Sequence, residues 1–445
     1  MLIVTPKRFE AAVGEYATFK RERRPVEVAV LESVIAKTEG ADDPERLKRF
    51  VFEAWKARGV KFVLLVGDAD VIPVRYMCLD RVTAPAFDYA FYPSDLYYAD
   101  VAKRDGSFED WNGNKEGFHA QYFGEVRGEK NKTDAMNFDG VDYKPEVAVG
   151  RWPVSNVEQL KVVVEKSRAY EMGRVGDGEM GSGQENVESG KGKVEREKKQ
   201  VLAIMTGGWV DMRGRLDSIL GMLPRSWKAE RLYYSDGDAA FATEAPDEGH
   251  VVAGLNGGPW PRLVLHVGHG ADDRWEGCFS VGSLKKVSNA GHLPVVLSAG
   301  CSTARFATLP PYEAYVDVNG RPHVGTDAGE VFSGPPPAPS CYATGPYNKT
   351  GLGEQLVVGG LNGAVAYIGC NTGSQPCGVT LLEGFAAAVG KKSTIGECWM
   401  EAESYYFDHE GLATLKPSGD WYPASIFFQG MKFMLYGDPS LGVGE

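Results

Sequence analysis

Short runs of apolar, often β-branched residues alternate with longer segments whose apolar residues recur at helical spacing. We expect strands in the runs at 2–5, 26–31, 62–68, 146–151, 201–208, 229–234, 262–270, 293–301 and 364–370. We expect helices near 42–58, 157–171, 211–222, 351–359, 378–390, 394–409 and 421–436. Strands that alternate with helices are typical of parallel sheets. The pattern therefore predicts an α/β fold, with two adjacent, doubly wound and mostly parallel sheets flanked by helices in an α/β/α sandwich.

Three segments interrupt this rhythm. Residues 172–199 are rich in Gly, Glu and Lys and hold almost no large apolar residue, which predicts a flexible linker or a long surface loop. Two insertions, an aromatic and acidic one at 85–145 and a proline-containing one at 305–350, are too long for ordinary connections. We therefore expect an N-terminal α/β subdomain over 1–171 and a second subdomain over 200–445.

Composition and charge narrow the class of protein. The chain has 445 residues, of which 43% are hydrophobic and 24% charged, as in an ordinary globular protein. Its formal net charge of −12 argues against a broad surface for nucleic acid or an anionic membrane. The first residues lack the pattern of a signal peptide, and no apolar run approaches the length of a membrane span. We expect a cytoplasmic protein that binds neither nucleic acid nor a membrane directly.

The cysteines are odd in number and scattered along the chain. They are Cys78, Cys278, Cys301, Cys341, Cys370, Cys377 and Cys398. No Cys-x-x-Cys pair occurs, which excludes a zinc ribbon and argues against a disulfide framework. Most are therefore expected to be buried thiols, which leaves room for one reactive cysteine.

Two neighbouring predicted strands end in residues that can do chemistry. The run at 262–270 ends in His269 and Gly270, and the run at 293–301 ends in Cys301. Ligands of open parallel sheets bind outside the carboxyl ends of the strands. A thiol beside an imidazole forms a nucleophile with its general base. The backbone N–H groups of Gly270 and Cys301 are then candidates to stabilise an oxyanion.

Simpler interpretations of these residues stay open at this point. A cysteine at the end of a buried strand is more often structural than catalytic. A phosphate-binding turn is disfavoured, because the glycine spacing is wrong and Asp272 and Asp273 would repel phosphate. A metal pair of His266 and His269 is disfavoured because residues three apart in a strand point to opposite faces. We expect His266 to be a packed strand histidine.

The chain resembles the gingipain-type cysteine peptidases of the caspase-like clan. The resemblance is carried by "GHG" followed by Trp275, and by "SAGCSTARF" around Cys301. Further similar stretches occur in the same order, namely "MLIVTPKRF", "FVLLVGDADVIPVRY", "EVAVGRWPVSNVEQLKVVVEKSRAYE", "GLGEQLVVGGLNGAVAYIGC" and "FMLYGDPSLGV". The separation of His269 from Cys301 also looks like that of the family's dyad. The resemblance covers almost the whole chain and implies a caspase-like fold, with 200–445 as the catalytic subdomain.

The resemblance assigns roles to individual positions. His269 matches the catalytic histidine, Cys301 the nucleophile and Gly270 the oxyanion-stabilising glycine. Trp275 matches an aromatic residue near the active site, with contact to substrate or packing as its role, and Glu354 matches a helix-start glutamate with a structural role. The loop after the next strand corresponds to a wall of the pocket for the residue before the scissile bond. Its residues here are Cys370, Asn371, Thr372, Gly373, Ser374 and Gln375.

Substrate preference and calcium binding follow less directly from the sequence. The family's specificity-determining acid lies before the catalytic histidine, where an acidic pocket would select Arg or Lys. The candidates are Asp236, Asp238, Glu244, Asp247 and Glu248. Alternating oxygen ligands resemble a calcium loop, although not an EF-hand, and a solvated acidic loop is the alternative. These ligands are Asp110, Asn112, Asn114 and Glu116, and the resemblance to a calcium-stabilised family implies a structural calcium ion.

The sequence therefore predicts a cysteine endopeptidase that cleaves a protein or peptide through a thioester acyl-enzyme. No cofactor is required for this chemistry. Two alternatives are a transpeptidase or peptide ligase, in which an amine captures the acyl-enzyme, and a catalytically silent caspase-like regulatory or binding protein. Insertion 305–350 is expected to form a gate or a partner-sensing lid over the cleft. Segment 172–199 is a candidate for self-cleavage or a plain surface loop, and a regulatory protein partner is conceivable.

Overall fold

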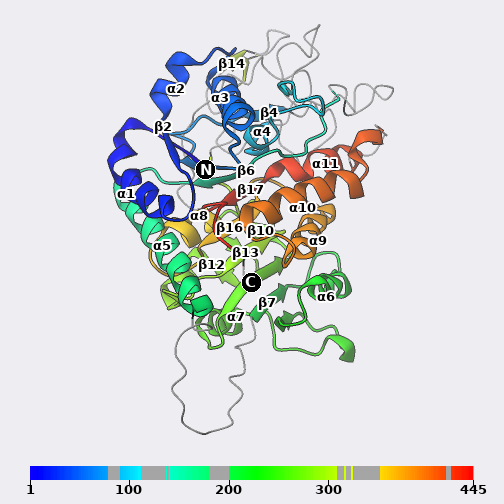
Figure 1. Cartoon of the computed structure of the whole chain (residues 1–445). Coiled ribbons are helices and arrows are strands. Elements are labelled where there is room, and N and C mark those ends of the chain that lie inside the picture. The colour runs from blue at the N-terminus through cyan, green and yellow to red at the C-terminus, as the bar shows by residue number, and fades with distance from the viewer. Residues whose placement is uncertain are drawn as a thin grey trace, which may run out of the picture.

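The computed structural model describes most of the chain. The described residues are 1–78, 91–111, 137, 140–179, 200–307, 315–316, 322–323, 351–416 and 422–443. Strands lie in the middle of the molecule, and helices cover both faces of the sheet that they form (Figure 1). This arrangement is the α/β/α sandwich that the sequence predicts.

Ten strands form one mostly parallel sheet in the order β2-β1-β3-β6-β17-β16-β13-β9-β7-β8. Their bounds are β1 Leu2–Thr5, β2 Glu27–Val30, β3 Phe62–Val66, β6 Ala148–Trp152, β7 Gln200–Met205, β8 Lys228–Tyr233, β9 Pro261–Val267, β13 Val295–Ser298, β16 Ala366–Cys370 and β17 Phe433–Tyr436. All neighbouring strands are parallel except β16 and β17. The prediction of a mostly parallel α/β sheet is therefore confirmed.

The expectation of two adjacent sheets is wrong in one respect, because the last strand joins them. β17 pairs with β16 on one side and with β6 on the other, where Tyr436 lies opposite Arg151. The sequence predicts a helix over 421–436, whereas the helix α11 (Tyr422–Gln429) ends early and β17 follows. A short apolar run cannot be assigned to strand or helix by periodicity alone. Because β16 and β17 are antiparallel, the carboxyl ends of the two halves face opposite edges of the sheet.

The remaining helices pack on the two faces of the sheet. Their bounds are α1 Glu10–Arg21, α2 Leu31–Lys37, α3 Asp43–Arg58, α4 Leu96–Ala99, α5 Val157–Glu179, α6 Arg213–Met222, α7 Glu248–Asn256, α8 Leu352–Val358, α9 Val379–Ala388 and α10 Ile395–His409. Helix α5 continues to Glu179, so the first part of the expected linker 172–199 is helical. Within the described residues, no helix is long and apolar enough to cross a membrane.

Alternation along the strands builds two hydrophobic cores. In β3, Leu65 belongs to one core and Leu64 to the other, as period-two side chains of a strand require. Leu297 and Val296 of β13 divide in the same way. Each core therefore contains residues from both halves of the chain and extends across the junction at β17.

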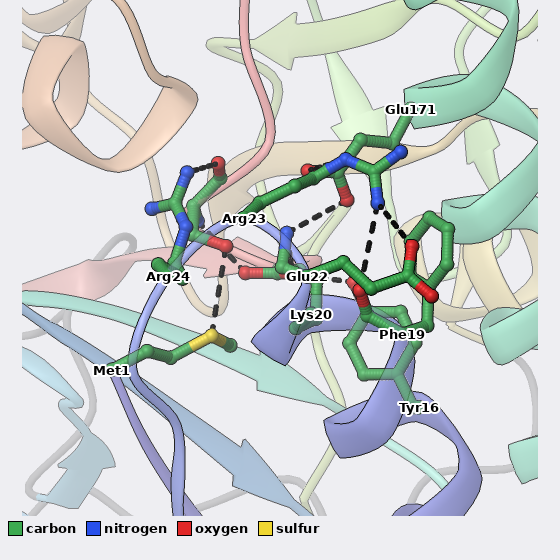
Figure 2. Close-up of polar contacts among 10 residues, drawn as sticks. Met1, Tyr16, Phe19, Lys20, Glu22, Arg23, Arg24 and Glu171 are labelled. Atoms are coloured by element: carbon green, nitrogen blue, oxygen red, sulfur yellow. Dashed lines mark hydrogen bonds and ion pairs between the residues drawn. The ribbon is translucent and has the colours of Figure 1, made fainter.

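A buried charge cluster ties the C-terminal segment to two helices (Figure 2). The Lys20 side chain of α1 is fully buried, and its Nζ lies 2.8 Å from Glu171 of α5 and 3.2 Å from Asp438. Tyr16 donates a hydrogen bond to the same Asp438 carboxylate. Burial would raise the pKa of Asp438, but the Lys20 charge and these hydrogen bonds outweigh it and lower the pKa. The cluster holds α1, α5 and the segment after β17 together.

Candidate active site

The turns after β9 and β13 contact each other at the carboxyl ends of these strands. Within these strands His266 lies directly opposite Ser298, so the two strands end side by side. A methyl group on Gly270 would lie 2.8 Å from the Cys301 carbonyl oxygen and 3.1 Å from the Gly300 carbonyl carbon. Only glycine fits such a close approach of two backbones. The structure therefore brings together the predicted His269–Gly270 and Cys301 segments.

His269 is half-buried and is held by a backbone carbonyl. Its Nε2 lies 2.9 Å from the Gly208 oxygen, which can only accept a hydrogen bond. Nε2 therefore carries a proton, and in the neutral ring Nδ1 is left as the acceptor, as a general base requires. The Trp209 ring lies 6.5 Å from the imidazole. Sequence reasoning missed Gly208, although it follows β7 at the point where the strand order reverses between β7 and β9.

The Cys301 thiol is held by the loop after β16. The backbone N–H of Ser374 donates a hydrogen bond to Sγ over 3.3 Å, and the thiol lies 3.5 Å from the Ser374 oxygen. Burial raises the pKa of Cys301, while the Ser374 N–H and the Lys432 charge oppose this rise and Glu276 adds to it. Among the described residues, no hydrogen bond joins the imidazole to the thiol.

Trp275 is not placed to contact a substrate. Its side chain is 1% exposed and stacks on His266 with ring centroids 4.6 Å apart. Its Nε1 donates a hydrogen bond to the Tyr367 hydroxyl over 3.2 Å. The prediction of Trp275 as a substrate-binding residue is therefore wrong, whereas its alternative packing role agrees with the structure. His266 is buried and packed, as expected.

The loop at 370–375 supports the turn that carries Cys301. All of its residues are buried, namely Cys370, Asn371, Thr372, Gly373, Ser374 and Gln375. The Thr372 oxygen accepts a hydrogen bond from the Ser302 N–H over 2.7 Å, and Ser374 contacts the thiol. The expected role of these residues as a substrate pocket wall stays a prediction.

The five acidic candidates for specificity all have other partners. Asp236 pairs with Arg213, Asp238 caps the 3-10 turn Ala239–Phe241, and Glu248 contacts Ser283 and Lys286. Glu244 and Asp247 lie 3.3 and 3.0 Å from His250. The geometry therefore singles out none of the five as a free carboxylate for a basic side chain.

Glu354 is buried rather than a charged helix start. It lies in the first turn of α8, and burial raises its pKa well above the usual range. Asp68, which follows β3 in the other half, adds to this rise, and its own pKa is raised to about 7 by burial. The negative charge of one such carboxyl group disfavours ionisation of the other. Glu354 therefore has a structural role, as expected. It fills this role as a buried side chain rather than as a negative charge at the start of a helix.

The predicted calcium ligands are not tested by the structure. Asp110 is described, whereas Asn112, Asn114 and Glu116 lie outside the described residues. Over the described ranges, no group of three or more His, Cys, Asp or Glu residues is placed to hold a metal ion. Most of insertion 305–350 also lies outside these ranges. Calcium and the lid remain predictions.

Comparison with known proteins agrees with the fold. A model of peptidase family C25 matches residues 1–444. The complex of Porphyromonas gingivalis RgpB pro- and mature domains is 16% identical with a TM-score of 0.59, covering 99% of this chain and 79% of that one. The crystal structure of the Arg-specific cysteine proteinase gingipain R (RgpB) is 17% identical with a TM-score of 0.56, covering 99% and 77%. No curated protein matches.

These matches agree with the fold described above. Both solved structures match the fold of this chain, with TM-scores above 0.5 over 99% of its residues. The family model extends over nearly the whole chain, including both strand ends that carry His269 and Cys301. The chain therefore belongs to peptidase family C25, the gingipain family, and is a cysteine protease.

Proposed function

We propose that the chain is an endopeptidase in which Cys301 is the nucleophile and His269 the general base and acid. The observation that supports this best is the contact between the two strand-end turns. The hydrogen bond from His269 to Gly208 supports it further, because it leaves Nδ1 available as a proton acceptor.

The reaction starts with proton transfer from the thiol to His269 Nδ1. Because burial raises the pKa of Cys301, the thiol keeps its proton until the base removes it. Sγ then bonds to the peptide carbonyl carbon, and the N–H groups of Gly270 and Cys301 stabilise the oxyanion. The C–N bond breaks as His269 protonates the leaving amine. Water, deprotonated by His269, hydrolyses the thioester and restores the thiol. No cofactor takes part.

Cleavage after Arg or Lys is the preference that we propose to test first. One of the similar structures is that of RgpB, an Arg-specific cysteine proteinase. The five acidic candidates have other partners, so the preference requires one of them to change partner or another acid to take part. A positional-scanning peptide library with wild type and Cys301→Ala, with and without calcium, identifies the preferred residue. Cleavage that Cys301→Ala retains would contradict the proposal.

Two other functions are separated by simple assays. A transpeptidase or ligase would transfer the acyl group to an added amine, so product analysis with an amine acceptor distinguishes it from a hydrolase. A silent regulatory protein would not react at Cys301 with an acyloxymethyl ketone at neutral pH.

Calorimetry with calcium tests the structural ion, and a lack of both binding and thermal stabilisation would contradict it.

Regulation by a protein partner or by self-cleavage is a further proposal. The similar RgpB structure holds pro- and mature domains in complex, and a comparable partner here would restrain the protease. Segment 172–199 contains several basic residues at which self-cleavage is possible. Mass spectrometry of wild type beside Cys301→Ala tests this, because fragments present equally in both would exclude self-processing.

Deleting insertion 305–350 tests the lid, and unchanged turnover and specificity would contradict it.

A further inference from the structure

A row of two buried polar side chains crosses β9 and β13 directly beneath the two catalytic turns. His266 of β9 and Ser298 of β13 lie opposite each other and are both fully buried. His266 Nδ1 lies 2.9 Å from Ser298 Oγ. The other central residues of these strands are apolar. Buried polar groups are costly unless they are hydrogen-bonded, so this pair calls for an explanation.

Ser298 holds the residue that precedes the nucleophile. Its Oγ accepts a hydrogen bond from the Gly300 N–H over 3.2 Å. It also lies 3.3 Å from Thr303 Oγ1, which donates to the Gly300 oxygen over 3.1 Å. Both peptide groups of Gly300 are therefore fixed by one small network.

The turn that this network holds is strained. Ser302, next to Cys301, has a φ of 57°, a left-handed conformation that is costly for residues other than glycine. Strained residues persist only where the surrounding structure holds them. The hydrogen bond from the Ser302 N–H to the Thr372 oxygen holds the far side of the turn, and the Ser298 network holds the near side.

His266 contacts the other catalytic turn as well. A methyl group on Gly268, which precedes His269, would lie 3.4 Å from His266 Nε2, and one on Gly300 would lie 3.2 Å from His266 Cε1. The His266 imidazole therefore packs against both turns. Stacking on Trp275 fixes its plane, and the hydrogen bond from Trp275 to Tyr367 anchors the stack to β16.

We propose that His266 is a positioning residue that sets the placement of His269 relative to Cys301 through Ser298. It touches neither substrate nor the reacting atoms, and its catalytic meaning rests on the proposed function. A shift of about 1 Å between nucleophile and base lowers turnover on the order of 10²-fold, so a small loss of order in this row is costly.

Two substitutions of His266 separate its two contacts. His266→Phe keeps a ring that can stack on Trp275 but removes the hydrogen bond to Ser298. His266→Asn keeps a polar atom near the Nδ1 position but removes the stacking ring. Ser298→Ala removes the other partner, and Ser283→Ala is the matched control, since it deletes a buried serine hydroxyl whose partners are Ser280 and Glu248.

The expected result is a loss of kcat without a matching change in KM. We expect kcat to fall about 10- to 100-fold in His266→Phe and Ser298→Ala. The double variant should lose little more than either single variant, because both remove the same hydrogen bond. His266→Asn should retain more kcat than His266→Phe, and Ser283→Ala should keep the wild-type kcat. Wild-type kcat in His266→Phe, or fully additive losses in the double variant, would overturn the proposal.

A second readout does not depend on peptidase activity. The rate of iodoacetamide alkylation at Cys301, followed by mass spectrometry against pH, reports the fraction of thiolate. Besides His269, the charged groups that act on this thiol are Lys432 and Glu276. We expect a higher midpoint in His266→Phe, because a displaced Sγ loses the Ser374 N–H. An unchanged midpoint contradicts the proposal, whereas a wild-type Cys301 that cannot be alkylated at any pH contradicts the proposed function instead.

Discussion

Gly270 shows how tightly the residues around Cys301 are packed. A Cβ atom there would lie 2.6 Å from Thr303 Cγ2 and 2.8 Å from the Cys301 oxygen, closer than real atoms approach. We expect Gly270→Ala to separate the two turns and to lower kcat/KM by about 10²-fold, with an unchanged circular dichroism spectrum. Gly221→Ala is the control, because nothing lies within 4 Å of its added methyl group. Wild-type kcat/KM in Gly270→Ala would show that the turns do not need this contact.

The burial of His266 should also make the stability of the protein depend on pH. Burial lowers its pKa from 6.5 to about 3. The unfolded chain therefore binds a proton between these values that the folded chain does not, and this contribution to stability is lost as pH falls below 6.5. His266→Phe removes the contribution, so its free energy of unfolding relative to wild type should rise on acidification, by up to about 1.4 kcal/mol per pH unit.

Urea unfolding of both proteins between pH 5 and pH 7 measures this difference. Comparing the two proteins removes the contributions that other titrating groups make to both. One such group is Asp68, whose pKa is raised to about 7, so that its contribution to stability falls as pH rises across the same window. A difference that does not change with pH would mean that His266 has the same pKa in the folded and the unfolded protein.

At the scale of residues, the sequence predicts His269 and Cys301 as the reacting groups, but not the residues that hold them in place. His269 and Cys301 follow strands, and the rule for carboxyl ends of strands is enough to pair them. Gly208 acts through its carbonyl, which every residue has, so no side chain marks it. Sequence reasoning misplaces Trp275 because an aromatic residue near the site in sequence can lie either in the cleft or under it. Only the packing on His266 distinguishes the two.

At the scale of elements, helix α8 is held by a buried lysine of α5. Lys166 Nζ donates hydrogen bonds to the oxygens of Leu356, Val357 and Asn362 over 2.8–2.9 Å. Replacing it with methionine leaves these carbonyls without a donor, so we expect Lys166→Met to lower the free energy of unfolding by about 2–3 kcal/mol. Lys161→Met, on the exposed side of α5, should change it by less than about 0.5 kcal/mol.

The pH dependence of the same variant gives a second check. Burial lowers the pKa of Lys166 to about 7, so wild-type stability should rise as pH increases from about 7 towards the unfolded value near 10.5. Lys166→Met should lack this rise. A variant with the same stability and the same pH profile as wild type would show that the three hydrogen bonds contribute nothing.

Most elements could be predicted because each carries its own periodic pattern. Thr394 is the N-cap of helix α10 and forms a capping box with Glu397, and Asp42 is the N-cap of α3, which has Pro44 in its first turn; both signals are readable from the sequence. β17 could not be predicted, since Phe433–Tyr436 is a short apolar run that continues a helical segment. Its identity as a strand depends on pairing with β6 and β16, which are distant in sequence.

At the scale of the whole molecule, we expect the chain to unfold as one unit rather than as two. The sheet is continuous through β17, and both cores include residues of both halves. The ion pair of Lys20 with Asp438 joins the last segment to the first helix. We expect one cooperative transition in differential scanning calorimetry, with equal calorimetric and van't Hoff enthalpies. Two separate transitions would contradict this, and the sequence alone favours two units because its rhythm restarts after 172–199.

In the mechanism that we propose, Cys301 forms an acyl-enzyme with His269 as its base. Rapid acid quenching with a peptide ester, followed by mass spectrometry of the digested protein, locates the acyl group directly. We predict an acyl adduct on Cys301 in wild type, no adduct in Cys301→Ala, and formation slowed by at least about 10²-fold in His269→Ala. Acylation of another residue, or hydrolysis by Cys301→Ala at the wild-type rate, would contradict the account.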